Sequence, residues 1–336
     1  MKAIIYGPSH TLQIAEIEKP VPADDEVLLR VRAASVNPLD GHLLKTAPWM
    51  RNLMSTMIGT RVKRPGADVA GEVEAVGRNV TRFAPGDAVF GGSSGGGFAE
   101  YACPPESKLA KMPANTSFEA AASVNVAGRT ALQGLRDVAG VVRGQKVLVN
   151  GASGGVGTFA VQIAKWLGAD VTGVCSTRNI DLVHGLGADR VIDYTCEDLL
   201  ESDERYDVIF DLVSDKPLLA LRRVLTPKGK WVGAGVLGVD ASMISMIASS
   251  VKTPLLSLFT GQKFGSFITK SGNDDLGVLA KLIEAGHVTP SIDRTYRLDE
   301  VADAVRYVTA KHARGKVVIS VGDPNSTLLD REPNKS

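Results

Sequence analysis

The sequence contains little cysteine, and its few cysteines are not arranged in motifs. Only three of the 336 residues are cysteine, at Cys103, Cys175 and Cys196, and no two of them form a C-x-x-C pair. This pattern argues against a disulfide framework and against a zinc lobe built from cysteines. It is typical of a protein kept in a reducing compartment, and we predict a cytoplasmic location.

The chain also lacks an excess of charge and a long hydrophobic run. It has 38 Lys and Arg residues against 37 Asp and Glu residues, so nothing indicates a basic surface for nucleic acid or an anionic membrane. Residues 241–251 are uncharged but too few to cross a bilayer, and the uncharged residues 147–164 contain a glycine turn. The first ten residues lack the apolar core of a signal peptide. We therefore expect no nucleic-acid partner and no membrane span.

The most informative segment that is present is residues 147–179, VLVNGASGGVGTFAVQIAKWLGADVTGVCSTRN. VLVN and VTGVC are short apolar runs typical of buried strands, and the residues between them predict a helix from Gly157 to Leu167. Strand and helix are joined by Ala152-x-Gly154-x-x-Gly157, a variant of the G-x-G-x-x-G fingerprint of dinucleotide sites. The N–H groups that open such a helix can bind a pyrophosphate. We predict that a dinucleotide contacts Ala152, Ser153, Gly154, Gly155, Val156 and Gly157.

The residues that would contact the ribose of the cofactor are not acidic. In a site for NAD, an Asp or Glu about 20 residues beyond the fingerprint binds the ribose 2′-hydroxyl. Here that region is Ser176-Thr177-Arg178. Hydroxyls and a guanidinium bind a 2′-phosphate, which a carboxylate would repel. The segment therefore predicts NADPH as the cofactor, and the alternative is a tight turn with three solvated side chains.

The pattern of elements changes twice along the chain. Residues 1–122 read as short strands separated by Pro, Gly and Asp turns, and we expect this part to be all-β. Residues 123–288 alternate strands and helices, which is typical of a doubly wound parallel sheet. Residues 289–322 are expected to rejoin the first domain, and the polar tail 323–336 is expected to be disordered. The strands expected in the parallel sheet are residues 147–150, 171–175, 190–194, 206–213, 230–236 and 265–269.

Several longer motifs occur in an order that resembles a known family. They include AASVNPLD, GADVAGEVEAVGRNVTRFAPGDAVFG, AASVNVAGRTALQGL, GADRVIDY and HARGKVVISV. The chain is similar to the medium-chain dehydrogenase/reductase superfamily, in its zinc-free quinone oxidoreductase branch, which includes zeta-crystallin. The resemblance implies an α/β fold in which a Rossmann domain with a doubly wound parallel sheet is inserted in a GroES-like β-rich catalytic domain. It also implies an NADPH-dependent reductase of quinones or α,β-unsaturated carbonyls, with its site between the two domains.

The residue types also bear on zinc. The zinc alcohol dehydrogenases of the superfamily place a cysteine near the position of Asn37 and a Gly-His-Glu near residues 66–68, which are Gly-Ala-Asp here. Zinc needs three or four N, S or O ligands, and neither the cysteine nor the histidine is present. Without this Lewis acid an alcohol is not activated, whereas quinones and enones are already electrophilic. We expect no metal site and predict reduction of a small apolar quinone or carbonyl substrate.

The resemblance places the catalytic part of the site in the loop that begins at Asn37. This residue matches the Asn of the family's S-V-N-P motif, which contacts the nicotinamide ribose and the substrate; the alternative is a simple turn residue. Asp40 and His42 follow in the same loop. Relatives often have a tyrosine near the position of His42 that is thought to orient the carbonyl. His42 could donate a proton or a hydrogen bond there, or it could simply be solvated.

Five further residues are predicted to contact the cofactor. The resemblance matches Thr130 to a threonine near the nicotinamide phosphate and Tyr194 to a tyrosine that helps to hold the 2′-phosphate. Val213 and Gly235 lie at the ends of the fourth and fifth strands, where open α/β sheets bind ligands. Lys316 matches another family segment near the cofactor, although it could equally be a surface charge. The alternatives are a purely helical role for Thr130 and a packed ring for Tyr194.

Two questions stay open at the level of the sequence. The apolar residues 241–267 could line a substrate cleft or an interface between two subunits, and we expect a homodimer. The chain could also be an enoyl-thioester reductase of the same superfamily, or a non-catalytic NADPH-binding protein with a structural or RNA-binding role. Its neutral charge argues against RNA.

Overall fold

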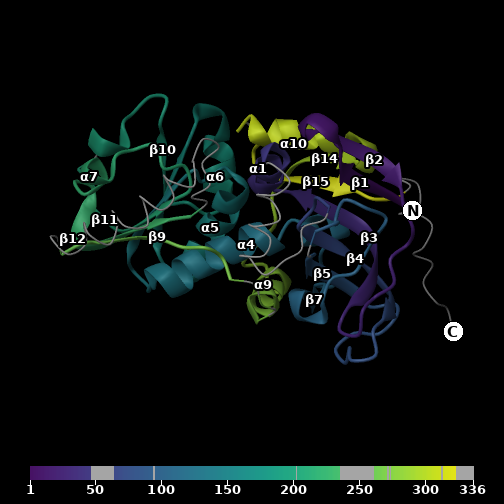
Figure 1. Ribbon diagram of the computed structural model, residues 1–336. Coiled ribbons are helices and arrows are strands. Elements are labelled where there is room, and N and C mark those ends of the chain that lie inside the picture. Colours follow the sequence, from purple (N-terminus) through teal and green to yellow (C-terminus); the bar gives the residue numbers. More distant parts are fainter. Residues whose placement is uncertain are drawn as a thin grey trace.

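The protein contains two large sheets that lie side by side (Figure 1). The computed structural model describes residues 1–46, 64–93, 95–201, 203–234, 261–270, 272, 274–311 and 313–322. Figure 1 shows a teal and green half, formed by the middle of the chain, beside a half that combines purple and blue strands with yellow ones. The middle of the chain is therefore inserted between two parts of the other half, which confirms the predicted fold class.

The first sheet has six parallel strands in the doubly wound arrangement that the sequence predicted. Its order is β10-β9-β8-β11-β12-β13, so the chain starts in the middle, winds to one edge, returns and continues to the other edge. The direction of winding reverses between β8 and β11, which is where such sheets bind ligands. The strands are β8 (Lys146–Asn150), β9 (Asp170–Cys175), β10 (Arg190–Asp193), β11 (Tyr206–Asp211), β12 (Leu225–Gly233) and β13 (Lys263–Ser266).

Several strand limits differ from the predicted ones, and β12 begins at Leu225 rather than residue 230. β11 ends at Asp211 rather than residue 213, because the next two N–H groups bond to the Asn150 carbonyl and to the Asp211 side chain. β13 ends at Ser266 rather than residue 269, and its parallel pairing with β12 joins Ser266 to Gly233, the last residue of that strand. These limits depend on hydrogen bonds of the folded protein that the local sequence does not show.

The helix α5 (Gly155–Trp166) follows the glycine turn and begins two residues earlier than predicted. Gly154 is its N-cap in an extended conformation, so helical geometry starts directly after it. The helix ends before Gly168, whose φ of +83° is one that glycine adopts readily. The other α-helices among the described residues of this half are α4 (Asn125–Leu132), which continues into a π-helix (Gln133–Ala139), α6 (Ile180–Gly185), α7 (Leu218–Leu221) and α9 (Asp274–Glu284).

The second sheet joins the two ends of the chain. Its order is β14-β15-β3-β4-β5-β7, with β6 also paired to β3, and the late strand β15 runs antiparallel to the early strand β3. A separate hairpin is formed by β1 and β2. The strands are β1 (Lys2–Tyr6), β2 (Leu12–Glu16), β3 (Val27–Val36), β4 (Asp68–Val76), β5 (Ala88–Gly92), β6 (Tyr101–Ala102), β7 (Leu109–Lys111), β14 (Ile292–Arg297) and β15 (Lys316–Ser320).

The expectation that residues 1–122 are all-β is wrong, because this part contains the helices α1 (Pro38–Lys45) and α3 (Phe118–Ala122). At the start of α1, Pro38 takes the first helical position, and the Asp40 carboxylate accepts a hydrogen bond from the Asn37 N–H at 2.8 Å. These capping signals start a helix within a strand-rich region. α1 packs against the C-terminal helix α10 (Val301–Thr309).

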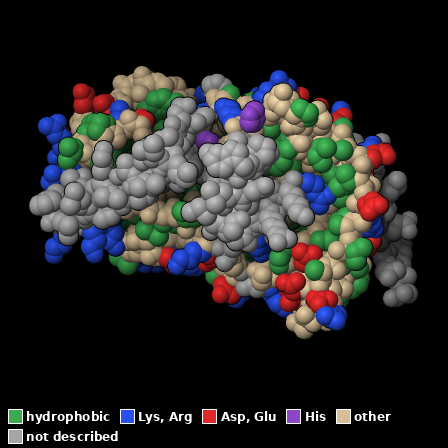
Figure 2. Space-filling view, viewed as in Figure 1, with side chains coloured by type: hydrophobic (Ala, Val, Ile, Leu, Met, Phe, Trp, Pro, Cys, Tyr) green, Lys and Arg blue, Asp and Glu red, His purple; other side chains and the backbone are tan. Residues whose placement is uncertain are grey.

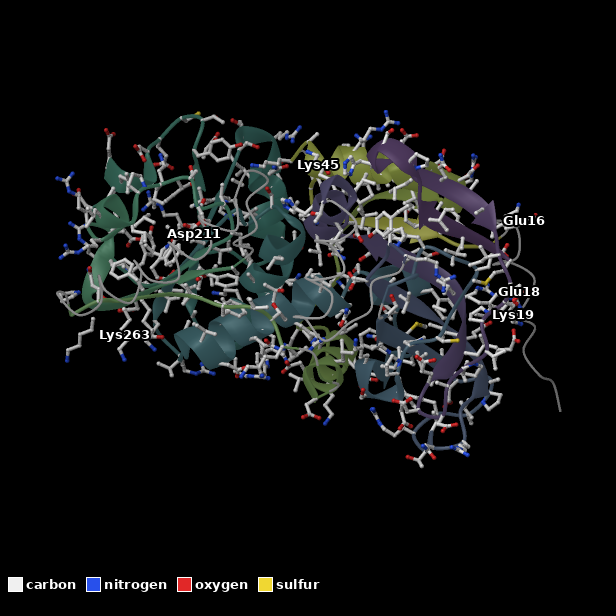
Figure 3. The ribbon with its side chains drawn as sticks, in the orientation of Figure 1. Glu16, Glu18, Lys19, Lys45, Asp211 and Lys263 are labelled. Atoms are coloured by element: carbon white, nitrogen blue, oxygen red, sulfur yellow. The ribbon has the colours of Figure 1, made fainter. Side chains whose placement is uncertain are left out.

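Hydrophobic side chains form the cores on the two sheets. On the face in Figure 2 the described hydrophobic side chains are interspersed with polar and charged ones. Figure 3 shows Asp211 within the parallel-sheet half, whereas Lys45 lies near the junction of the two halves. Among the described residues no helix is long and apolar enough to cross a membrane. The predictions for Gly235, for residues 241–260 and for the tail 323–336 lie outside the described residues.

Candidate cofactor and active site

The glycine turn after β8 is closely packed. Gly151 has a φ of +86°, and the Gly154 N–H donates to the Gly151 carbonyl at 3.1 Å. A Cβ at Gly157 would lie 2.1 Å from that carbonyl oxygen, so this position requires glycine. Ala152 is fully buried and Val156 packs against the same core, which explains why alanine serves in the first position of the fingerprint. α5 thus starts directly at the turn, with N-terminal N–H groups that can bind an anion.

The glycine turn also contacts the other half of the protein. Gly154 forms an isolated parallel bridge with Gly315, just before β15. A Cβ at Gly155 would lie 3.1 Å from the side chain of Lys316. Further along α5, the side-chain amide of Gln162 donates to the Thr289 carbonyl at 3.0 Å and accepts from its N–H at 2.7 Å. The N-terminal end of α5 is therefore held against the start of β15.

The structure brings Ser176, Thr177 and Arg178 next to residues at the end of the neighbouring strand. The Tyr194 N–H donates to the last carbonyl of β9 at 3.1 Å, and the hydroxyl oxygens of Thr177 and Thr195 are 2.8 Å apart. Arg178 is exposed, and Tyr194 is 63% exposed, so a packed role for its ring is wrong. Residues with hydroxyl, guanidinium and phenol groups therefore follow the ends of the paired strands β9 and β10, and their contact with a cofactor stays a prediction.

Asp193 lies beside this group and was not considered from the sequence. It is the last residue of β10 and accepts hydrogen bonds from the N–H and the hydroxyl of Thr195 at 3.0 and 2.8 Å. Bonds from the Thr177 and Thr195 hydroxyls lower the pKa of Asp193 to about 2. The carboxylate is therefore charged but occupied by these hydroxyls.

Asn179 is a further residue of this region that the sequence did not reveal. Its side chain is only 4% exposed and donates to the hydroxyl oxygens of Ser153 and Ser176 at 3.0 and 3.2 Å. It therefore connects the glycine turn to the end of β9. Its position directly after Arg178 was the only available signal.

The end of β11 is built around a buried carboxylate. Asp211 is fully buried and accepts hydrogen bonds from the Asn150 amide at 2.9 Å, from the Trp231 indole at 3.0 Å and from the Val213 N–H at 3.1 Å. A Cβ on Gly151 would lie 2.8 Å from the Val213 side chain, so Val213 borders the glycine turn. Asp211 thus shapes this edge of the turn rather than facing a ligand.

Among the described residues, the Thr130 hydroxyl bonds to none of the other predicted site residues. The hydroxyl donates to the Val126 carbonyl one helical turn earlier at 2.7 Å and lies 2.9 Å from that of Thr269. This is the bonding expected of a threonine within a helix. Its contact with a cofactor stays a prediction.

Lys316, Asn37 and Asp68 form a buried cluster. The exposed fractions of these side chains are at most 3%. The Lys316 ammonium donates to Asn37 Oδ1 at 2.7 Å and lies 3.6 Å from Asp68 Oδ2, while Asn37 Nδ2 donates to the same carboxylate at 2.9 Å. The interpretation of Lys316 as a surface charge is wrong. Because Lys316 fixes the oxygen of Asn37 and Asp68 fixes its nitrogen, the orientation of this amide is determined.

Asp68 receives several more donors. The Ser35 hydroxyl donates at 2.7 Å, the Asn125 amide at 2.8 Å and the Val126 N–H at 3.2 Å. Asn125 lies at the start of α4, so Asp68 links the second sheet to a helix that packs on α5. The sequence did not predict the parts played by Asp68 and Asn125, because their partners are distant along the chain.

Asp40 is buried close to this cluster. Its oxygens accept hydrogen bonds from the N–H groups of Asn37 at 2.8 Å and Gly66 at 3.3 Å. Burial, assisted by the charge of Asp68, raises the pKa of Asp40 to about 7 against the opposing effect of these hydrogen bonds and of Lys316. Burial also lowers the pKa of Lys316. Asp40 can therefore hold a proton near neutral pH.

This pKa predicts a dependence of stability on pH. Because the folded-state pKa of Asp40 lies above its ordinary value of 3.8, the folded protein binds this proton more tightly, and the contribution to stability is lost as the pH rises from about 4 to about 7. We measure the free energy of unfolding by urea at pH 5 and at pH 8. Between these pH values it should fall by roughly 2–3 kcal/mol less in Asp40→Asn than in the native protein. Exposed Asp25→Asn is the control and should keep the native dependence; an unchanged dependence in Asp40→Asn would contradict the assignment.

His42 lies on α1 but does not join the cluster. Its carbonyl accepts a hydrogen bond from the Thr46 hydroxyl at 2.7 Å. Its ring atom Nε2 is buried and has no hydrogen-bond partner among the described residues. The side chain is half-buried, so full solvation is wrong, and its catalytic role stays a prediction.

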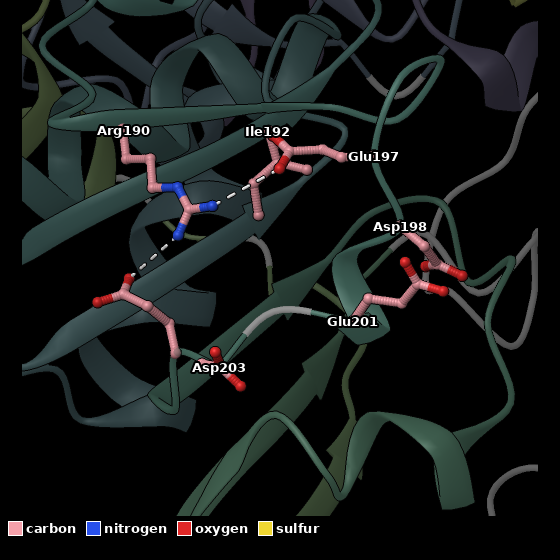
Figure 4. Close-up of a pocket in the computed structure, with 7 residues that line it drawn as sticks. Arg190, Ile192, Glu197, Asp198, Glu201 and Asp203 are labelled. Carbon is pink, nitrogen blue, oxygen red and sulfur yellow. Dashed lines mark ion pairs between the residues drawn. The ribbon is translucent and has the colours of Figure 1, made fainter.

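A separate hollow lies at the outer edge of the parallel sheet (Figure 4). It has a volume of about 420 Å³ and an acidic lining of Glu197, Asp198, Glu201, Asp203 and Glu204 with Arg190. Arg190 pairs with two of these glutamates at 3.7 Å, as the dashed lines in Figure 4 show. Such a lining would repel phosphates, so the hollow is not part of the candidate cofactor site. Within the described ranges no three His, Cys, Asp or Glu side chains are grouped to hold a metal.

Comparisons with known proteins agree with this geometry. Residues 23–114 match the model of the alcohol dehydrogenase GroES-like domain, and residues 186–319 match a family model described as zinc-binding dehydrogenase. The chain is 33% identical over 331 residues to a chloroplast envelope quinone oxidoreductase homolog of Arabidopsis thaliana, covering 93% of this chain and 95% of that protein. It is 31% identical to an NADPH-dependent alkenal/one oxidoreductase, chloroplastic, of the same plant, covering 95% and 79%.

The fold of the chain is also similar to that of solved structures. The structure of the quinone oxidoreductase from Coxiella burnetii superposes with a TM-score of 0.82 at 28% identity and covers 96% of this chain and 99% of that one. The inserted parallel sheet, the glycine turn after its first strand and the GroES-like domain together define the fold of a two-domain dehydrogenase. The chain belongs to the medium-chain dehydrogenase/reductase superfamily, in its quinone oxidoreductase branch.

Proposed function

We propose that this protein is an NADPH-dependent reductase of quinones or α,β-unsaturated carbonyls that works without zinc. The observation that carries this proposal is the buried Lys316 ammonium between Asn37 and Asp68. Asn37 and Asp68 match the positions where the zinc enzymes of the superfamily have their cysteine and their Gly-His-Glu. The Lys316 ammonium lies 3.6 Å from the Asp68 carboxylate and would balance its charge. The names of the Arabidopsis relatives support the two substrate classes.

The residues at the turn and at the ends of β9 and β10 fit the cofactor. The start of α5 and Ser153 would hold the pyrophosphate, because N–H and O–H groups converge there. Ser176, Arg178 and Tyr194 would hold the 2′-phosphate, with Thr177 beside them. When bound, the nicotinamide supplies a hydride to the electrophilic carbon of the acceptor. Val213 and Gly235 would border its carboxamide, and Thr130 its adjacent phosphate.

The catalytic half of the site would orient the reactants rather than activate them. Lys316 and Asp68 hold the Asn37 amide, and this amide would position the nicotinamide ribose and the substrate. The Asp40 carboxyl group accepts hydrogen bonds from the N–H groups of Asn37 and Gly66, so it would support the start of α1 rather than contact the substrate. His42 would contact the carbonyl oxygen of the substrate, and water can protonate the reduced product.

The test is NADPH oxidation measured in parallel with a 1,4-quinone, a short 2-alkenal and a crotonyl thioester, before and after treatment with a chelator. We expect turnover of the quinone or the alkenal that the chelator does not change. Turnover of the thioester alone would favour the enoyl reductase alternative. Tight NADPH binding without oxidation of any acceptor would overturn the reductase proposal in favour of a binding protein, and zinc-restored activity after chelation would overturn zinc independence.

Several sequence predictions belong to this proposal. We propose domain limits at residues 122 and 288, which the sheet pairing supports, with residues 289–322 in the catalytic domain. A homodimer and a cytoplasmic location stay predictions from the sequence. The two Arabidopsis relatives are named as chloroplast proteins.

A further inference from the structure

We infer that Asn179 is a positioning residue that sets the NADPH preference by directing the hydroxyl hydrogens of Ser153 and Ser176 toward the phosphates of the cofactor. This inference rests on the proposed function, because it concerns the same cofactor site. It assigns a task to a side chain that itself would not contact the ligand.

The first support is that Asn179 does not do what its position in the helix would suggest. It is the N-cap residue of α6, where an asparagine side chain normally accepts a hydrogen bond from the first turn. Here the side chain makes no capping bond. It donates instead to Ser153 at 3.0 Å and to Ser176 at 3.2 Å, 26 and 3 residues away in sequence. Asn179 therefore makes no capping bond to its own helix, and its two side-chain bonds instead join the glycine turn to the end of β9.

The second support comes from the number of donors. A serine hydroxyl has one hydrogen and can accept through its lone pairs. Because Asn179 Nδ2 donates to both serine oxygens, neither serine can use its hydrogen toward that group. Within the part of the chain that the structure describes, neither hydroxyl has a protein acceptor. The hydroxyl hydrogens of Ser153 and Ser176 are therefore free to donate to an anion such as a phosphate of the cofactor.

The third support is the location of the two serines. Ser153 is in the glycine turn before α5, and Ser176 follows the end of β9, two residues before the exposed Arg178. A dinucleotide across this edge would place its pyrophosphate near the first serine and its 2′-phosphate near the second. Asn179 itself is 4% exposed, with Oδ1 buried and unpartnered, so it is fixed beneath the site. One buried amide would thus orient donors for both phosphate positions.

The hydrogen bonds from Asn179 to Ser153 and Ser176 should affect the binding of NADPH and NADH differently. NADPH and NADH share the pyrophosphate, so the effect through Ser153 is common to both. Only NADPH carries the 2′-phosphate, so the effect through Ser176 appears only with NADPH. Loss of Asn179 should therefore weaken NADPH more than NADH, which a general loss of packing would not do.

The experiment measures the dissociation constants of the full-length protein for NADPH and NADH by titration calorimetry. We expect Asn179→Ala to weaken NADPH about tenfold and NADH clearly less. Asn179→Asp, whose carboxylate would draw both hydroxyl hydrogens inward, should weaken NADPH further. Asn115→Ala is the matched control, because it removes an amide bond to the Ile283 carbonyl far along the chain and should change neither affinity.

A double-mutant cycle with Ser176→Ala separates positioning from structure. If Asn179 acts through Ser176, adding Asn179→Ala to Ser176→Ala should not reduce the ratio of NADPH to NADH affinity any further. An unchanged ratio in Asn179→Ala, or additive losses of the ratio in the double variant, would overturn the inference while leaving the proposed function intact. A native protein that binds neither cofactor would overturn both. Thermal unfolding without cofactor monitors folding in every variant, and the ratio within one variant does not depend on its stability.

Discussion

Replacing Lys316 with methionine is expected to lower the free energy of unfolding by about 3–5 kcal/mol, the usual cost of leaving one member of a buried ion pair without its partner. Lys316 is 3% exposed, and its ammonium lies 3.6 Å from the fully buried Asp68 carboxylate. Methionine has a similar length, so the change removes the charge while keeping most of the packing. The Asn37 oxygen loses its donor at 2.7 Å at the same time.

Activity should fall with stability, because the Asn37 amide is no longer held in one orientation. Urea unfolding measures the first effect, and the kcat/KM for the acceptor, taken where the protein is folded, measures the second. Adding Asp68→Asn should recover part of the stability, since no buried charge is then left alone. Exposed Lys281→Met is the control and should stay within about 0.5 kcal/mol of the native protein. A Lys316→Met protein of native stability would show that the cluster does not act as an ion pair.

Replacing Arg178 with aspartate is expected to weaken NADPH binding about 100-fold or more while changing NADH binding far less. The guanidinium is exposed at the end of β9, beside Ser176. Losing a charge-assisted hydrogen bond costs about 1.5–3 kcal/mol, and the new carboxylate would also repel a 2′-phosphate. The same carboxylate could accept a hydrogen bond from the 2′-hydroxyl of NADH. Arg178→Lys should lose less than Arg178→Asp, because it keeps the charge.

Direct titration of both cofactors checks this prediction. Arg143→Asp makes the same change of charge before the start of β8, at the opposite end of the strand from the glycine turn, and should leave both affinities near native. Equal weakening of NADPH and NADH in Arg178→Asp would refute the assignment of the 2′-phosphate to this place.

Local patterns were sufficient to predict the parallel sheet. Apolar runs such as VLVN identify buried strands, and the glycine turn between strand and helix identifies one end of the sheet. The expectation of an all-β first domain was wrong, because a proline and a capping aspartate after Asn37 start a helix in a strand-rich region. The limits of β11 and β13 were also missed, since β11 ends where its own Asp211 side chain accepts the Val213 N–H and β13 ends with its pairing to β12.

Some residues of the candidate site could likewise be predicted from the sequence, and others could not. Ser176, Thr177 and Arg178 are contiguous with β9, so their grouping could be predicted from one segment. Asp193 was overlooked, although its carboxylate lies beside Thr177 at the end of the neighbouring strand. The bridge from Asn179 to Ser153 spans 26 residues and has no local signature.

The sequence by itself determined the family, the order of the elements and the region of the cofactor, because hydrophobic periodicity and glycine turns act over a few residues. Only the tertiary structure decided what Lys316 does. Its side chain meets Asn37 across 279 residues and is buried with Asp68, where an ammonium and a carboxylate must compensate each other because water is excluded. That requirement depends on which groups the two sheets bring together, and no local pattern records it.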